Sequence, residues 1–447
     1  LSRLLKSMNK IIFQKILIYF LFFLVFLFFF LGFYLNENSA GAGGYDGDIN
    51  WIIKNIEIFK NNDLIEAIFH EDMFGNRTPL IYIINKLFNP FFFEYEKYRF
   101  FVFFLSLTGP YFIFLCLKKK YPDVNTELLL LTSSVILLSP FYRTSGYWGM
   151  NENYGIISTI ISLMTLSFFL KKIELKNQIN KYFYLTIFFS SLSIYFDQKC
   201  LIITMICFFS IVFSNIQRKY KFYALVIYIF LSIPYLILIF KWGGLVPIKT
   251  QVANPNAITN ISRVGDLYFY HLGYLSTIVG FYLFPLILLK ERNISKIITN
   301  FISSKWFYVI VITPLLYIFF IYTYYDFKFY TVDNYWVGLG AVHKIANIMF
   351  ININFREIFT YTTFFFSWIV IFLYLEEEIT DYLILIFFFI LSLFIWPLMQ
   401  EYIDPIIIIL SLMAFKTKIK ITFYKVIFLF LYFSIFLISS NLYYSNI

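Results

Sequence analysis

Long apolar stretches recur from one end of this 447-residue chain to the other. A helix that crosses the hydrocarbon core of a bilayer needs about 20 apolar residues, and these stretches approach that length. The apolar runs are continuous rather than alternating, which excludes a transmembrane β-barrel. Hydrophobic residues make up 60% of the chain and mean hydropathy is +0.74, more apolar surface than a soluble domain can bury. The sequence therefore predicts an all-α, polytopic transmembrane protein.

The stretches predict about 13 spans within a single integral membrane domain, residues 1–447, with no separate soluble domain. The predicted spans are residues 16–35, 100–117, 127–142, 155–170, 182–196, 200–216, 222–240, 267–289, 306–325, 361–375, 382–398, 403–415 and 421–440.

The positions of the basic residues predict the orientation of these spans. Arg3, Lys6, Lys10 and Lys15 precede the first span, and further Lys and Arg recur at every second inter-helix segment. Cytoplasmic loops carry this excess, so we expect a cytoplasmic N-terminus. The net charge of +10 then reflects topology and contact with anionic membrane lipids rather than a nucleic-acid partner. The acidic run at 376–378 is an exception on the predicted inner side.

The longer polar loops all fall on the predicted outer side. They are residues 36–99, 143–154, 241–266 and 326–360. Short inner turns and elaborate outer loops indicate a protein that works at the non-cytoplasmic face, and we expect a bacterial inner membrane rather than an endoplasmic reticulum. The three cysteines and three histidines lack metal-ligand spacing, so no structural metal site is predicted.

Two acidic residues, Asp46 and Asp48, follow the first apolar span closely. A carboxylate at the membrane surface can act as a general base on an acceptor hydroxyl, which makes Asp48 the first candidate and Asp46 its helper or replacement. A structural alternative for Asp48 is the N-cap of a helix that starts at Ile49. The pair also forms an Asp-x-Asp, and two carboxylates suit Mg²⁺ or Mn²⁺, so a divalent metal at Asp46 and Asp48 is a further hypothesis.

The rest of the first outer loop predicts interfacial helices. Apolar residues at 49, 52, 53, 56 and 59 mark one face of a helix that is too short and too polar to span a bilayer. Asp63 and Glu66 have capping-box spacing, which predicts a second short helix.

Four short motifs resemble those of a known group of membrane enzymes. Gly-Asp-Ile at 47–49 is similar to that family's Asp-Glu-Ile, and Thr-Pro-Leu-Ile-Tyr at 78–82 to its Thr-Pro-Pro-x-Leu-Tyr. Asp-Gln-Lys-Cys-Leu-Ile at 197–202 partly matches Arg-Gln-Thr-Asn-Ile-Ile, with Asp197 in place of an arginine. Gly-Gly-Leu-Val at 243–246 is similar to Gly-Gly-Ile-Val.

On these motifs the chain resembles the GT-C superfamily of glycosyltransferases, and within it the dolichyl-phosphate-glucose α-1,2-glucosyltransferases, which add the last glucose to the lipid-linked oligosaccharide. A more distant bacterial lipid-linked-sugar transferase is the alternative. The resemblance implies a catalytic acid in the first outer loop, a polyprenyl-phosphate-linked sugar donor and a lipid-linked or cell-surface glycan acceptor. It places donor recognition in the loop after Gly243.

Cations on the outer side are candidates for binding the departing phosphate. They are Arg77, Arg143, Lys199, Lys249, Arg263, His271, Lys344 and Arg356, of which Arg77, Lys249, Arg263 and His271 are the principal ones. Contact with anionic headgroups is the structural alternative for each. Glu152, in an aromatic-rich loop, suits recognition of sugar hydroxyls, although Tyr and Trp there also fit the interfacial belt.

These features predict a glycosyltransferase, and other classes remain as alternatives. A glycolipid flippase would place charged residues within its helices and show repeated halves, and neither is evident. An O-antigen polymerase or ligase shares the helices but carries its large loop late in the chain. A protein-glycosylating transferase is the third alternative.

Overall fold

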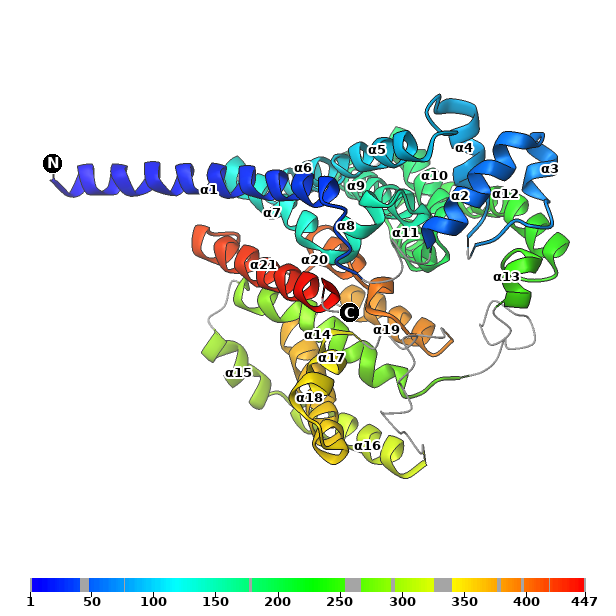
Figure 1. The fold of residues 1–447 in the computed structure, drawn as a ribbon. Helices are drawn as coiled ribbons and strands as arrows, with labels where there is room; N and C mark the ends of the chain where they lie inside the picture. The colour runs from blue at the N-terminus through cyan, green and yellow to red at the C-terminus, as the bar shows by residue number, and fades with distance from the viewer. Residues whose placement is uncertain are drawn as a thin grey trace. The chain divides into compact units, whose positions relative to one another are not determined.

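The computed structural model describes residues 2–40, 48–75, 77–176, 179–253, 267–290, 294–324, 340–375, 379–394, 398–417 and 419–445. Within these ranges the chain is helical and contains no β-strand, only an isolated bridge between Lys290 and Ile419 (Figure 1). The predicted all-α class is confirmed for this part of the chain. The chain forms two compact units, and the prediction of a single membrane domain stays a prediction.

The first unit comprises Leu1–Ile261, Leu412–Ala414 and Thr422–Ile447. Its helices are α1 (Ser2–Tyr34), α2 (Asp48–Asn61), α3 (Leu64–Ile68), α4 (Leu80–Phe88), α5 (Tyr95–Ser106), α6 (Thr108–Lys120), α7 (Thr126–Ser134), η1 (Val135–Leu138), α8 (Pro140–Tyr147), α9 (Asn151–Lys176), α10 (Lys181–Phe196), η2 (Gln198–Cys200), α11 (Leu201–Phe213), α12 (Arg218–Trp242), α13 (Ile248–Ala253) and α21 (Phe423–Ser445). Helix α9 is central, since it packs against α6, α10 and α11, while α1 packs against α7.

The second unit comprises Ser262–Ser411 and Phe415–Ile421. Its helices are α14 (His271–Leu288), α15 (Ile294–Ile302), α16 (Phe307–Tyr324), α17 (Ala341–Met349), α18 (Ile353–Tyr374), α19 (Ile379–Ser392), η4 (Gln400–Tyr402) and most of α20 (Ile406–Met413). Helix α18 is the hub of this unit and packs against α14, α16 and α17.

Among the described residues, eight helices are long and apolar enough to cross a membrane. They are Ile12–Tyr34, Tyr95–Lys120, Asn151–Glu174, Arg218–Trp242, His271–Leu288, Phe307–Tyr324, Ile353–Tyr374 and Phe423–Tyr444. A bent pair, Thr126–Leu138 with Pro140–Tyr147, would make nine. A multi-pass membrane protein is therefore supported, whereas the predicted number of about 13 spans stays a prediction.

The bend explains one difference from the predicted spans. Residues 127–142 were expected to form one span, but the helix breaks at Ser139 and turns by 71° into α8. Pro140 occupies the first turn of α8, and the Ser139 side chain accepts a hydrogen bond from the Tyr142 N–H at 3.1 Å. Proline lacks the N–H that a continuing helix needs, and serine satisfies the start of a new one. Much of the predicted loop 143–154 is helical as a result.

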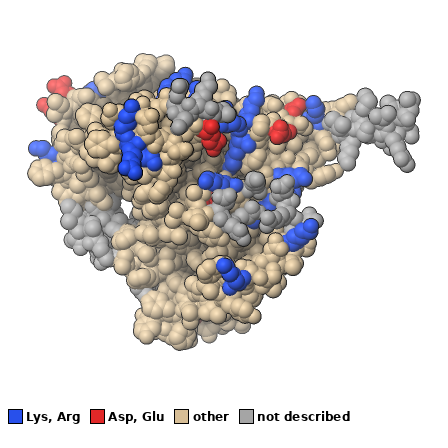
Figure 2. Space-filling model, turned by 180° about the vertical axis from the view of Figure 1, so that it is seen from behind, with Lys and Arg blue, Asp and Glu red and all other residues tan. Residues whose placement is uncertain are grey.

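The surface agrees with a membrane environment. Large apolar side chains are exposed on several helices, among them Phe88, Phe213 and Phe240. Figure 2 shows one face on which the charged side chains are few and separated by wide uncharged areas. An exposed apolar surface of this extent is stable where lipid rather than water covers it.

The first outer loop folds into the short helices that its sequence predicts. Helix α2 covers the predicted periodic segment and buries Ile52, Asn55, Ile56 and Phe59. Helix α3 starts after Asp63 as expected, but the Asp63 side chain makes no capping hydrogen bond, so the capping-box detail is wrong. The first outer loop is therefore folded into two short helices, α2 and α3, before α4 begins.

Candidate functional site

Asp48 lies at the first residue of α2 and is partly buried. A carboxylate in the first helical turn is stabilised by the unsatisfied N–H groups and by the helix dipole. The helix begins one residue earlier than the sequence predicted, so Asp48 lies inside its first turn rather than at the N-cap before Ile49. Asp46 lies outside the described residues, and so does Arg263.

The hydroxyl of Tyr82, on α4, is at the centre of a polar cluster, the Tyr82 cluster, whose other members are Asp48, Asn55, Asn151 and Glu152. Tyr82 is buried and accepts a hydrogen bond from Asn55 Nδ2 at 3.1 Å. The pKa of Tyr82 is raised to about 12, first by burial and then by the negative charges of Glu152 and Asp48. Hydrogen bonds with Asn55 and Asn151 act in the opposite direction. The phenol is therefore neutral at physiological pH, with both acidic residues near enough to affect it.

Arg77 and Glu152 form an ion pair beside this cluster. Glu152 lies in the first turn of α9 and is 5% exposed, and the Arg77 side chain is 17% exposed. The pair therefore fixes the guanidinium of Arg77 against the start of α9. Two predicted site residues that are 75 positions apart in sequence are thus brought into contact.

The segment that starts at Asp197 adjoins the same part of α9. A Cβ atom on Gly155 would lie 3.0 Å from Cβ of Asp197, so the glycine permits the close packing of α9 on η2. Asp197 and Lys199 form an ion pair at 3.1 Å. Lys199 Nζ also lies 4.4 Å from the centre of the Phe141 ring. Lys199 is therefore part of the local packing.

Two hydrogen bonds and one ion pair connect further loops to this region. Thr78 Oγ1 donates to the Tyr195 carbonyl at 2.6 Å, and Gln198 Nε2 donates to the Leu245 carbonyl at 3.0 Å. Lys249 pairs with Asp72 on the first loop. Both of these side chains are exposed, and the hydrogen bond and charge of Lys249 lower the pKa of Asp72. The loop after Gly243 is thereby held against the first outer loop.

Three other cations predicted to bind phosphate belong to the second unit. His271 belongs to the second unit, where it is buried with Nδ1 at 2.9 Å from the Ser392 carbonyl and its ring stacks on Tyr268. Lys344 is also in that unit, on α17, and burial lowers its pKa to about 8. Arg356 donates from Nε to the Phe350 carbonyl. All three of these residues therefore belong to the second unit, whereas the Tyr82 cluster belongs to the first.

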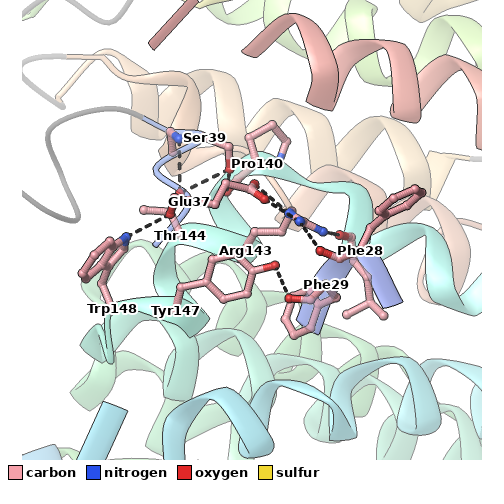
Figure 3. A network of polar contacts seen from close by, with 11 residues as sticks. Phe28, Phe29, Glu37, Ser39, Pro140, Arg143, Thr144, Tyr147 and Trp148 are labelled. Carbon is pink, nitrogen blue, oxygen red and sulfur yellow. Dashed lines mark hydrogen bonds and ion pairs between the residues drawn. The ribbon is translucent and has the colours of Figure 1, made fainter. Parts of the chain in front are cut away.

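Arg143 corrects one sequence-based assignment, because its guanidinium is bound by the protein itself (Figure 3). It is 2% exposed and donates to both carboxylate oxygens of Glu37, at 2.8 Å from Nε and 2.5 Å from Nη2. It also donates to the carbonyl groups of Leu137 and Phe28, at 3.2 and 2.9 Å. Arg143 therefore anchors the end of α1, and the hypothesis that it binds phosphate was wrong.

Sequence reasoning missed Asn55 and Asn151 and gave Tyr82 no individual role. The periodicity groups Asn55 with the polar residues opposite the apolar face, and this placement is wrong, because α2 buries Asn55 together with Ile52 and Ile56. Its Oδ1 accepts the Phe74 N–H at 3.2 Å while Nδ2 reaches Tyr82, so the side chain fixes the loop on both sides.

Within the described ranges, no group of three or more His, Cys, Asp or Glu residues is arranged to hold a metal ion. The hypothesis of a divalent metal at Asp46 and Asp48 stays a prediction, because Asp46 lies outside those ranges. No family model matches the sequence, and neither a curated protein nor a solved structure matches the chain.

Proposed function

We propose that this chain is a GT-C-type membrane glycosyltransferase that moves a sugar from a polyprenyl-phosphate donor to a lipid-linked or surface glycan. The reaction would take place at the non-cytoplasmic face, in a bacterial inner membrane, with the N-terminus in the cytoplasm and about 13 spans in all.

One observation carries the proposal: segments that are far apart in sequence and carry the four family-like motifs meet in the first unit. Asn55, on the helix that begins at the first motif, donates a hydrogen bond to Tyr82 of the second motif at 3.1 Å. Thr78 of the second motif is bonded to the backbone just before the third, and Gln198 of the third is bonded to the Leu245 carbonyl of the fourth. Hydrogen bonds thus connect the four segments in sequence, which supports a shared site.

The chemistry assigns a role to each part of the cluster. Asp48 accepts the proton of an acceptor hydroxyl as its oxygen forms a bond to the anomeric carbon of the donor sugar. The bond between that carbon and the phosphate oxygen breaks, and the phosphate leaves with the bonding electron pair. Arg77 stabilises the charge that develops on the phosphate, while Glu152 holds the guanidinium in place. The Tyr82 hydroxyl, neutral because its pKa is raised to about 12, supplies a hydrogen bond.

The test compares lipid-linked and surface glycans by mass spectrometry in cells that lack the gene and carry a plasmid copy. Wild type should restore one hexose-sized increment that deletion removes. Asp48→Asn should lower transfer by about 10²–10⁴-fold, the usual contribution of a general base. Asp63→Asn is the matched control, since Asp63 is an exposed acid of the same loop without a capping hydrogen bond, and it should behave as wild type.

Three outcomes would contradict the proposal in different ways. Full restoration by Asp48→Asn would remove the base assignment and make Asp46 the next residue to substitute. Unchanged glycans after deletion would overturn the transferase. An intact precursor that accumulates on the inner leaflet would instead identify a flippase.

A further inference from the structure

The far end of helix α9 from the Tyr82 cluster carries a dense group of lysines. Helix α9 begins at Asn151, in that cluster, and reaches Lys171 and Lys172 near its other end. Residues 151 to 171 of the helix rise about 30 Å, which equals the thickness of the hydrocarbon core of a bilayer. In a membrane, the lysines would therefore lie at the surface opposite to the Tyr82 cluster.

Three helices of the first unit contribute to this group, since α9 packs against both α6 and α10. Lysines at the end of α6, near the end of α9 and at the start of α10 are combined with two aromatic rings. We call this set the lysine–aromatic patch, and its members are Lys118, Lys119, Phe168, Lys171, Lys172, Lys181 and Tyr182.

One group of these lysines lies at the end of α6. Lys119 Nζ lies 5.9 Å from the centre of the Phe168 ring on α9. Lys171 Nζ donates a hydrogen bond to the Lys119 carbonyl at 3.3 Å, so its ammonium also lies at this helix end. Lys119 and Lys171 are both partly buried, and Lys118 beside them is exposed.

A second group surrounds the ring of Tyr182 on α10. Lys172 and Lys181 both lie over this ring, with Nζ at 5.2 and 5.6 Å from its centre. The Tyr182 ring meets the Phe168 ring edge to face, with 5.3 Å between the ring centres. Cation–π contacts hold the ammonium groups in place. The patch therefore has two groups of lysines, separated by two neighbouring rings.

The positive charge of the patch is not balanced by carboxylates of the described residues. None of its five lysines forms an ion pair with an Asp or Glu there. The like charges repel each other, and Lys181 opens α10, where the helix dipole disfavours a cation. A preference for lysine at helix C-termini therefore does not explain the patch, whereas a bound anion with several negative charges would offset both effects.

Apolar side chains continue from the patch along α10. Tyr184 and Phe188 follow Lys181 at three and seven residues, which places them on the same helix face, and both are exposed. A ligand with a charged head and hydrocarbon chains would contact the lysines with its head and these side chains with its chains. A membrane lipid has this chemistry, and a soluble polyanion does not.

We infer that the lysine–aromatic patch binds an anionic phospholipid with two phosphates, a lipid of the cardiolipin class. One phosphate lies at Lys119 and Lys171, and the other lies at Lys172 and Lys181. The acyl chains follow the exposed apolar face of α10. Basic sites between transmembrane helices are typical of such head-group recognition. This lipid site is separate from the Tyr82 cluster and does not depend on the proposed function.

The test measures lipid binding to the purified, delipidated full-length protein by native mass spectrometry. The probes are tetraoleoyl cardiolipin and dioleoyl phosphatidylglycerol at equal phosphate concentration. Half-saturation with cardiolipin should require at least tenfold less phosphate than half-saturation with phosphatidylglycerol. Inorganic pyrophosphate at the same phosphate concentration should not displace the bound cardiolipin.

A pair of double variants tests the location of the site. Lys119→Gln/Lys172→Gln removes one charge from each group and should weaken cardiolipin binding at least tenfold, whereas Lys119→Arg/Lys172→Arg should retain it. The matched control is Arg218→Gln/Lys219→Gln, which removes two exposed charges from the start of α12 alone and should bind like wild type. A monodisperse gel-filtration profile is the folding check for each variant.

Three results would overturn the inference. Equal losses in the Lys119/Lys172 and Arg218/Lys219 glutamine variants would show that net charge, and not this patch, attracts the lipid. Equal binding of phosphatidylglycerol would remove the requirement for two phosphates. Displacement by pyrophosphate would identify a site for a soluble polyanion. Because binding is measured without turnover, each of these results is independent of the glycan comparison that tests the transferase.

Discussion

The first unit contains two partly buried arginine–glutamate ion pairs that join residues far apart in the sequence and differ in their surroundings. Arg143 is enclosed by Glu37, two backbone carbonyl groups and the aromatic rings of Phe29 and Tyr147, at 5.5 and 5.3 Å (Figure 3). The Arg77–Glu152 pair lies instead beside Tyr82, on which a second carboxylate, that of Asp48, also acts. The comparison shows that burial and an ion pair do not by themselves mark a functional arginine. Neighbouring polar groups that a substrate could bind are the more informative feature.

The largest expected effect is on stability at the structural pair. Arg143→Ala would leave the Glu37 carboxylate buried without its partner and should lower the free energy of unfolding by about 3–5 kcal/mol. The measurement is unfolding of the purified protein in mixed micelles by increasing dodecyl sulfate. Arg143→Lys keeps the positive charge but not the parallel N–H donors of the guanidinium. Its free energy of unfolding should therefore fall by less than that of Arg143→Ala. A wild-type unfolding curve for Arg143→Ala would show that Glu37 finds another partner.

The second expected effect separates the two pairs by removing both charges at each. Arg77→Met/Glu152→Gln should unfold within about 2 kcal/mol of wild type, because replacing both members of a buried pair avoids an uncompensated charge. Its transfer activity should nevertheless fall about 100-fold or more, since the phosphate loses its cation.

The matched double variant is Glu37→Gln/Arg143→Met, whose activity per folded molecule should remain close to wild type. Equal activity losses in the two double variants would erase the functional distinction between the pairs.

A smaller effect is expected at Tyr82. Tyr82→Phe removes one hydrogen-bonding hydroxyl and should cost about 1 kcal/mol of stability. Because its folded pKa of about 12 lies above the ordinary tyrosine pKa of about 10, the hydroxyl's contribution is present below pH 10 and is lost as pH rises toward 12. The stability difference between wild type and Tyr82→Phe should therefore shrink over that interval. A constant difference up to pH 12 would contradict the assigned pKa shift.

The smallest effect is expected at the exposed pair of Asp72 and Lys249. Surface ion pairs contribute little because water and salt screen them, so Asp72→Asn should leave the thermal midpoint unchanged within error. Thermal unfolding at low and high salt is the measurement. A clear loss of stability at low salt would show that this pair, rather than Thr250, holds α13 on the first loop; Thr250 receives the Gly75 N–H at 2.9 Å.

Local sequence patterns predicted those features that depend on neighbouring residues. The apolar periodicity predicted α2, and Asp63 marked the start of α3. The break at Pro140 could have been predicted, because serine followed by proline is a typical helix start. It was missed since hydropathy alone does not distinguish a straight apolar helix from a bent pair.

The candidate site was predictable only in part. The sequence identified Asp48, Arg77 and Glu152 but not that the last two pair with each other. It also could not distinguish Arg143 from Arg77, because the partner of Arg143 lies 106 residues away. Asn55 was overlooked for a physical reason: its place among the polar residues of the helix predicts exposure to solvent, and it is buried because a tertiary partner, Tyr82, satisfies its amide.

Glycine at position 32 has a consequence for recognising relatives of this chain. A Cβ atom there would collide with the Glu37 carboxylate and lie 2.5 Å from Arg143 Nη2 and 2.7 Å from Tyr147 Oη. A chain that keeps this ion pair in the same geometry is therefore expected to keep glycine five positions before the acid, together with the Arg-x-x-x-Tyr of α8. Such a spaced signature joins two distant segments, so it identifies common ancestry more specifically than a short motif within one loop.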